Sequence, residues 1–121
     1  MDNAIELTFK KNYTVLKILL KEYNIYNTTS LSKKIEEAII EISTPYVLVD
    51  FNDVLYIDSS GIGSLAHVKK SLNKKGIEMI CIGMIENVIK VFKVTNTESL
   101  FHIFDRLDEG IKFIDNNLLL T

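Results

Sequence analysis

The stretch Tyr46-Val47-Leu48-Val49-Asp50-Phe51 is almost continuously apolar and follows Pro45, the only proline in the chain. Proline disfavours a helical conformation at the residue before it, so an extended segment is expected to follow Pro45. A strand with apolar residues on both faces is typical of a sheet that is covered on both sides. The sequence therefore predicts a buried strand here.

Strand and helix patterns alternate around this strand. Before it, residues 5–9 and 16–20 alternate apolar and polar side chains, as in a hairpin of half-buried strands, and residues 31–42 place apolar side chains on one helical stripe with hydroxyl caps offered by residues 28–30. After it we expect a helix following Gly63, a strand over 77–82, a helix around 88–92, a strand over 100–104 and a helix around 107–114. This order predicts an α/β fold, a central sheet with helices packed on it, in one domain spanning residues 1–121.

A polar turn interrupts this apolar pattern between residues 54 and 63. The run Val54-Leu55-Tyr56-Ile57 stops at Asp58-Ser59-Ser60-Gly61-Ile62-Gly63, and the residues that follow have helical spacing. A helix entrance presents unpaired backbone N–H groups and the positive end of the helix dipole, which favour an added anion. We therefore expect function to reside at Ser59 or Ser60, where a phosphate would gain local stabilisation.

Composition excludes several classes of function. The 121 residues carry a net charge of −2, which gives no electrostatic footprint for nucleic acid. Cys81 is the only cysteine and lies in an apolar run, so we expect a buried, reduced thiol. The first residues lack the pattern of a signal peptide, and no apolar run reaches membrane-spanning length, so we expect a cytoplasmic protein without a membrane segment.

Two enzymatic interpretations of the turn are weaker. Gly61-Ile62-Gly63-Ser64-Leu65-Ala66 matches the dinucleotide-binding fingerprint, but Asp58 would approach the pyrophosphate and the required acid is missing from the end of the next strand. A serine hydrolase needs a base, and neither histidine belongs to a catalytic motif. We expect His67 at the surface or boundary and His102 in the interior. No metal-ligand spacing occurs. We expect no enzyme activity, cofactor or metal.

The plainest interpretation of Asp58-Ser59-Ser60-Gly61 is a helix cap, in which Asp and Ser oxygens accept hydrogen bonds from N–H groups of the first turn and glycine permits the turn. Capping does not explain why two hydroxyls follow a carboxylate at the end of an apolar strand.

The element order and the motif Asp58-Ser59-Ser60-Gly61-Ile62-Gly63 resemble the STAS domain, and within it the bacterial anti-sigma factor antagonists. The resemblance covers nearly the whole chain. It implies a STAS-like single domain with a mixed four- to five-stranded sheet and about four helices, mainly on one face. It also implies that Ser59 is phosphorylated by a partner that is both a serine kinase and an anti-sigma factor.

The implied mechanism is partner switching, in which the unphosphorylated protein binds the kinase and a metal-dependent serine phosphatase resets the phosphorylated form. Asp58 would fix the turn, and Ser60, Gly61, Ile62 and Gly63 would surround Ser59 at the contact surface. Many members of the family have a Gly-Glu-Leu-Asp turn after the second strand, where this chain has Lys21-Glu22-Tyr23-Asn24, so we assign Tyr23 and Asn24 to the same surface.

Some members of the family share the fold without the switch, including stressosome subunits and transport accessory proteins. The alternative hypothesis is therefore a non-phosphorylated interaction subunit. A monomer is expected in either case, because no sustained heptad pattern appears.

Overall fold

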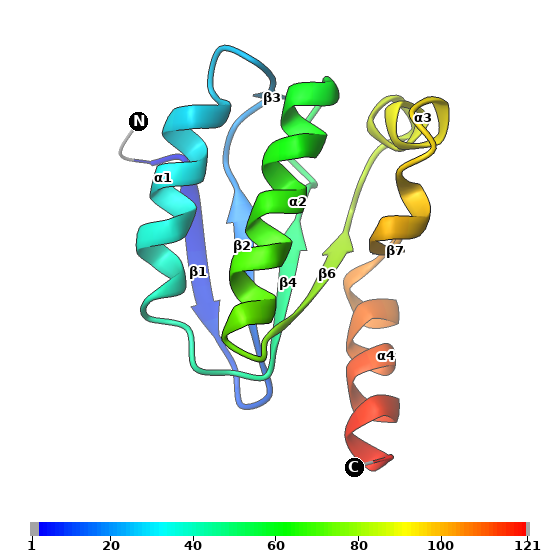
Figure 1. Ribbon diagram of the computed structural model, residues 1–121. Helices are drawn as coiled ribbons and strands as arrows, with labels where there is room; N and C mark the ends of the chain where they lie inside the picture. The colour runs from blue at the N-terminus through cyan, green and yellow to red at the C-terminus, as the bar shows by residue number, and fades with distance from the viewer. Residues whose placement is uncertain (1–2, 121) are drawn as a thin grey trace.

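The computed structural model describes residues 3–120, which form a five-stranded mixed sheet, a two-stranded sheet and four α-helices (Figure 1). In chain order the elements are β1 Ile5–Phe9, β2 Tyr13–Ile18, β3 Glu22–Tyr23, α1 Thr28–Ile39, β4 Tyr46–Asp50, β5 Tyr56–Ile57, α2 Ser59–Lys74, β6 Glu78–Ile82, α3 Glu86–Val94, the short 3₁₀ helix η1 Glu98–Leu100, β7 His102–Phe104 and α4 Leu107–Leu119. The large sheet has the order β1-β2-β4-β6-β7. Only β1 is antiparallel to its neighbour.

The sheet has an apolar core on each face. Side chains of α1 and α2 pack with Val47, Val49, Met79 and Cys81 on one face, and Figure 1 shows these two helices side by side across the sheet. On the other face Ile114 of α4 packs in a second cluster of buried residues, with Tyr46, Leu48, Ile80 and Ile82. The central strand β4 is therefore covered on both faces, as its apolar sequence predicts.

The predicted fold class is confirmed, and the detailed pattern needs several corrections. Helix α2 begins at Ser59 instead of after Gly63, β2 covers Tyr13–Ile18 instead of residues 16–20, and β7 begins at His102 instead of residue 100. Helix α1 begins at Thr28 instead of after residues 28–30. No side chain caps it, because the side-chain amide of Asn27, the residue before the helix, bonds to residues that precede it. The Asn27 amide accepts a hydrogen bond of 3.0 Å from Asn24 N and donates one of 2.6 Å to the carbonyl of Glu22. His102 is exposed, not interior, because β7 is the edge strand of the sheet. Its ring lies beside Phe113 of α4, with 4.8 Å between the ring centroids, and its Nε2 lies 2.9 Å from a carboxylate oxygen of Glu78.

The burial of the single cysteine agrees with the sequence. Cys81 is fully buried and unpaired, and burial raises the pKa of its thiol to about 12. In the part of the chain that the structure describes, no helix is long and apolar enough to cross a membrane.

The parallel strands place the polar turn at one end of the sheet. Strands β2, β4 and β6 are parallel, so their C-terminal ends lie at the same end of the sheet (Figure 1). Helix α2 starts at that end and runs back toward the N-terminal ends of the strands (Figure 1). The small sheet of β3 and β5 lies at this end and pairs Tyr23 with Ile57. The residues just after β5 therefore enter α2 beside the β3–α1 loop.

Candidate functional site

Asp58 caps α2 and also holds a second segment of the chain. Its Oδ1 accepts a hydrogen bond of 2.9 Å from the backbone N–H of Gly61 in the first turn of the helix. Its Oδ2 accepts one of 3.1 Å from the backbone N–H of Ile25 in the β3–α1 loop. Both carboxylate oxygens are therefore engaged, and the start of α2 is joined to the loop before α1.

Ser59 is the first residue of α2 and is exposed, whereas Ser60 is half-buried. Among the described residues, the hydroxyl of Ser59 has no hydrogen-bond partner. The first N–H groups of a helix have no partner within the helix, so the backbone at Ser59 and Ser60 offers donors to an anion. Ser59 thus presents a free hydroxyl on a fixed helix end.

Gly61 allows the helix to approach the small sheet. A Cβ at this position would lie 2.7 Å from Cγ1 of Ile57 and closer still to the carbonyl oxygen of Tyr23. No side chain fits there without displacing the backbone of β3. At Gly63, by contrast, a Cβ would meet nothing within 4 Å. Of the two glycines, only Gly61 is required by the packing.

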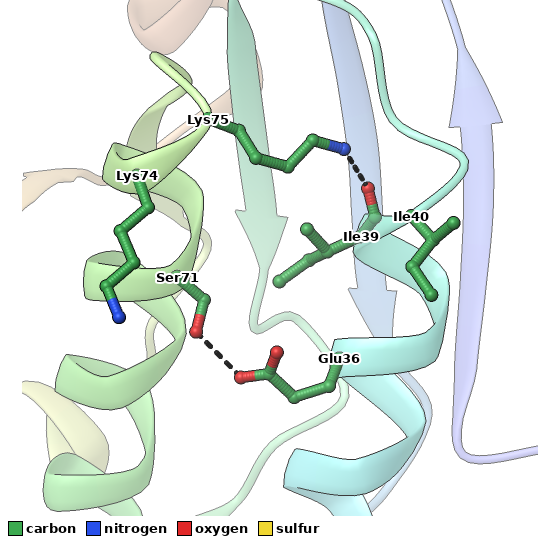
Figure 2. Close-up of a pocket in the computed structure, with 6 residues that line it drawn as sticks. All are labelled: Glu36, Ile39, Ile40, Ser71, Lys74 and Lys75. Carbon is green, nitrogen blue, oxygen red and sulfur yellow. Dashed lines mark hydrogen bonds between the residues drawn. The ribbon is translucent and has the colours of Figure 1, made fainter.

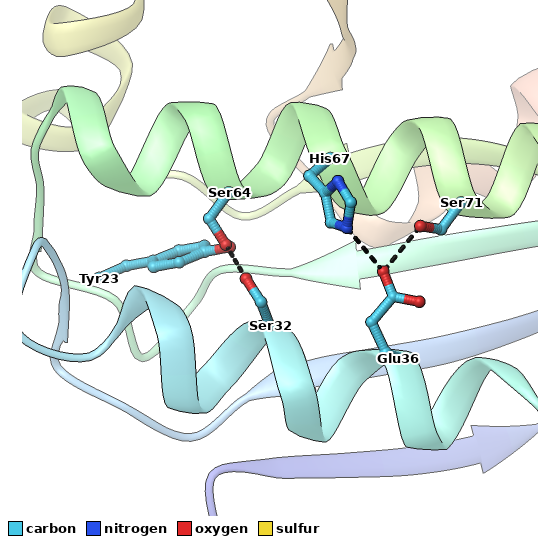
Figure 3. Close-up of polar contacts among 6 residues, drawn as sticks. All are labelled: Tyr23, Ser32, Glu36, Ser64, His67 and Ser71. Carbon is cyan, nitrogen blue, oxygen red and sulfur yellow. Dashed lines mark hydrogen bonds and ion pairs between the residues drawn. The ribbon is translucent and has the colours of Figure 1, made fainter.

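Tyr23 connects the turn to the interior of the α1–α2 interface. Its side chain is fully buried, and its hydroxyl donates a hydrogen bond of 2.6 Å to Oγ of Ser64, which lies 2.5 Å from Oγ of Ser32 (Figure 3). Burial raises the pKa of Tyr23 to about 12, partly offset by the bond to Ser64. The neutral phenol therefore anchors β3 to both helices.

A second polar group lies further along the same interface. One carboxylate oxygen of Glu36 accepts a hydrogen bond of 2.7 Å from the hydroxyl of Ser71 and lies 3.1 Å from Nε2 of His67 (Figure 3). The exposed position of His67 agrees with its predicted place at the surface or boundary. These contacts join α1 to α2 and leave the Ser59 end free.

Exposed apolar side chains surround the turn. Ile25 and Tyr26 in the β3–α1 loop are 64% and 93% exposed, and Tyr56 in β5 is 59% exposed. Large exposed apolar groups that gather in one place mark surfaces that bind other molecules. Ile25 and Tyr26 were not among the residues expected at the site, although two large apolar residues between Asn24 and Asn27 are a visible signal in the sequence.

Several expected contact residues have other positions. Tyr23 and Gly61 are buried, so they shape the turn instead of presenting a surface, which corrects that part of the sequence interpretation. Ile62 is largely buried, but it lines a small pocket together with Ser59. Asn24 is half-buried, and its Oδ1 accepts a hydrogen bond of 3.0 Å from Tyr26 N, which orders the loop. Gly63 is exposed and lines the same small pocket as Ser59.

A hollow of about 500 Å³ lies between the C-terminal ends of α1 and α2, far from Ser59 (Figure 2). There Lys75 Nζ donates to the carbonyls of Ile39 and Ile42 at 2.6 and 3.0 Å. This lysine neutralises the C-terminal end of α1, a structural role. Among residues 3–120, no group of three or more His, Cys, Asp or Glu side chains could hold a metal ion.

Comparison with known proteins agrees with this geometry. The sequence profile of the STAS domain matches residues 4–110. The anti-sigma-B factor antagonist of Staphylococcus aureus is 24% identical over 103 residues, which are 85% of this chain and 94% of that protein.

Two solved structures share the fold. The anti-sigma factor antagonist SpoIIAA in its unphosphorylated form superposes with a TM-score of 0.72 at 20% identity, covering 93% of this chain and 97% of that one. The phosphorylated form of SpoIIAA, a Bacillus cell fate determinant, superposes with a TM-score of 0.63 at 20% identity, covering 92% and 99%.

Proposed function

This chain belongs to the STAS domain family, and we propose that it is an anti-sigma factor antagonist controlled by phosphorylation of Ser59. The observation that carries the proposal is the free, exposed hydroxyl of Ser59 at the start of α2, on a turn fixed by Asp58. The likeness to the antagonist of S. aureus and to SpoIIAA, which has a phosphorylated form, supports it.

The proposed partner is a protein that is both an anti-sigma factor and a serine kinase. It would bind the unphosphorylated chain at the surface formed by Ser59, Gly63 and the exposed apolar residues Ile25, Tyr26 and Tyr56. The kinase would supply ATP and the catalytic groups, so this chain would act as substrate and ligand, not as an enzyme. Binding would release the sigma factor from the kinase.

Phosphorylation would end the binding by a local change of charge. A phosphate adds about −1.5 to −2 charges at neutral pH, and a docked partner would have to desolvate it. Because both oxygens of Asp58 are held by backbone N–H groups, the turn has its own anchor and can keep its shape when the phosphate is added. The switch would then act through charge at the surface, without refolding.

A metal-dependent serine phosphatase would remove the phosphate and restore binding. We propose that this exchange takes place in the cytoplasm, with the chain as a monomer. The alternative, a constitutive interaction subunit, would use the same surface without modification of Ser59.

The test is a comparison of Ser59→Ala and Ser59→Glu in binding to the serine kinase from the same cells, measured by calorimetry. We expect Ser59→Ala to bind as the unmodified protein does, and Ser59→Glu to bind at least about tenfold more weakly, a difference of about 1.4 kcal/mol. Ser43→Ala and Ser43→Glu are the matched controls and should bind as the unmodified protein does, because Ser43 is an exposed serine near Lys75 and Gly76, at the opposite end of α2. Equal affinity of Ser59→Ala and Ser59→Glu would refute the switch and favour the constitutive subunit.

A further inference from the structure

A small apolar pocket opens beside Ser59, between α2 and the segment that follows α3. Its volume is about 240 Å³, and it is lined by Ser59, Ile62, Gly63 and Ala66 from α2 and by Leu100 and Phe101 from the opposite side. We call it the Ser59 pocket. Ser59 therefore belongs both to the pocket and to the proposed contact surface.

The pocket offers little to a polar ligand. Thr95 and Thr97 complete its lining, but their hydroxyls are engaged with each other at 2.8 Å. Thr95 also donates a hydrogen bond of 2.8 Å to the carbonyl of Val91. No lining residue carries a charge. The hydroxyl of Ser59 is thus the free polar group of an otherwise apolar, neutral pocket.

The wall opposite α2 is held in place. The ring of Phe101 is buried and meets Phe92 edge to face, with 5.5 Å between the ring centroids. Lys69 of α2 donates a hydrogen bond to the carbonyl of Leu100, and its Nζ lies 5.6 Å from the ring centroid of Phe101. The pocket is therefore preformed, which lowers the entropic cost of filling it.

We infer that the Ser59 pocket receives one apolar side chain of the protein that docks at Ser59, an inference that rests on the proposed function. A cavity of about 150 Å³ lined by apolar groups accommodates benzene, so the Ser59 pocket has room for a leucine, methionine or phenylalanine side chain. The neutral lining selects against a charged group. Continuity with the proposed contact surface makes the docking protein the occupant.

This arrangement gives the phosphate a specific place to act. A phosphate on Ser59 would put its charge at the mouth of a pocket whose other hydroxyls are engaged and whose walls are apolar. An apolar side chain entering the pocket would strip water from the side of that charge that faces the pocket, where the wall opposite α2 offers no free hydrogen-bond donor, which is unfavourable. Occupation of the pocket and phosphorylation of Ser59 would therefore exclude each other.

The inference is tested by filling the pocket from α2. Ala66→Leu adds an apolar side chain at an exposed lining position without changing the charge, and Asn73→Leu adds one at an exposed position of the same helix outside the pocket. The affinity of each variant for the purified kinase that phosphorylates Ser59 is measured by calorimetry. Urea unfolding checks that both variants are folded.

We expect Ala66→Leu to weaken kinase binding at least about tenfold, because a buried apolar side chain of the partner loses its place. Asn73→Leu should bind within about twofold of the original protein. If the original protein binds the kinase and Ala66→Leu binds equally well, the pocket inference is wrong and the proposed function stands. If the original protein does not bind the kinase, both fail.

Sedimentation of the same samples without kinase tests whether a second copy of the chain occupies the pocket. Self-association of the original protein that Ala66→Leu abolishes, with kinase binding unchanged, would assign the pocket to a second copy of the chain and overturn the inference.

Discussion

Asp58 and Ile25 are joined by a hydrogen bond of 3.1 Å between a side-chain oxygen and a backbone N–H, although they are 33 residues apart in the sequence. The other oxygen of Asp58 caps α2 at Gly61. One carboxylate therefore fixes the helix that carries Ser59 against the loop that exposes Ile25 and Tyr26. The two halves of the proposed contact surface are aligned by this residue.

Replacing Asp58 should destabilise both the start of α2 and the β3–α1 loop. Asp58→Ala removes a helix cap, which we expect to lower the free energy of unfolding by about 1–2 kcal/mol. It also leaves the N–H of Ile25 without its acceptor, so hydrogen exchange at Ile25 should accelerate. Urea unfolding and amide exchange measured by NMR check these effects. Asp115→Ala, an exposed aspartate on α4, is the control; equal losses in the two variants would contradict the role of Asp58.

The two glycines at the start of α2 should respond in opposite ways to alanine. In Gly61→Ala the added methyl collides with Tyr23 and Ile57, and we expect a loss of about 1–3 kcal/mol. In Gly63→Ala the methyl enters open space on a helix, so stability should be unchanged or rise by about 0.5–1 kcal/mol. Chemical denaturation of both variants measures the difference. A Gly61→Ala protein as stable as Gly63→Ala would show that the close approach is wrong.

Two serines on the inner side of α2 should differ in their contribution to stability. Ser64→Ala removes the acceptor of the buried Tyr23 hydroxyl, and an unsatisfied buried polar group costs about 1–3 kcal/mol. Ser71→Ala breaks a hydrogen bond to Glu36, whose carboxylate is 41% exposed and can turn to water, so its cost should stay below about 1 kcal/mol. The comparison is made by urea unfolding at neutral pH. The reverse order would contradict the burial of the Tyr23 network.

The free energy of unfolding should fall at alkaline pH, because two buried groups, Cys81 and Tyr23, resist ionisation in the folded protein. Burial raises the pKa of Cys81 from 9.0 to about 12 and that of Tyr23 from 10.0 to about 12. The folded protein thus holds these protons more tightly than the unfolded chain, so their contribution is complete below pH 9 and is lost as the pH rises toward 12. Urea unfolding between pH 8 and 11 should show this decline. Cys81→Ala and Tyr23→Phe should each flatten it; an unaltered slope in both would refute the assignment.

Much of the fold could be predicted because the apolar spacing of its elements is strong. The run from Tyr46 to Phe51 reads as a doubly covered strand, and its residues Tyr46–Asp50 form one. The pairing of β3 with β5 could not be predicted, because strands of two residues are too short to show a periodic pattern. The burial of Tyr23 follows from that pairing, and for this reason a residue expected at the surface lies in the core.

The candidate site, like the fold, could be predicted from the sequence only in part. Asp58 as the cap of α2 follows from local chemistry, since an aspartate before a helix accepts an N–H of the first turn. Its second bond, to Ile25, depends on the tertiary fold and has no local signal. The pocket beside Ser59 could not be predicted from the sequence either, because its lining residues Ala66 and Leu100 come from segments that only the tertiary fold brings together.

The most direct measurement is mass-spectrometric mapping of phosphate on the protein isolated from the cells that make it, under several growth conditions. The account predicts phosphate on Ser59 in a proportion that changes with the condition, and none on the adjacent Ser60. Absence of phosphate from Ser59 under every condition, or its presence on Ser60 instead, would contradict the proposed switch.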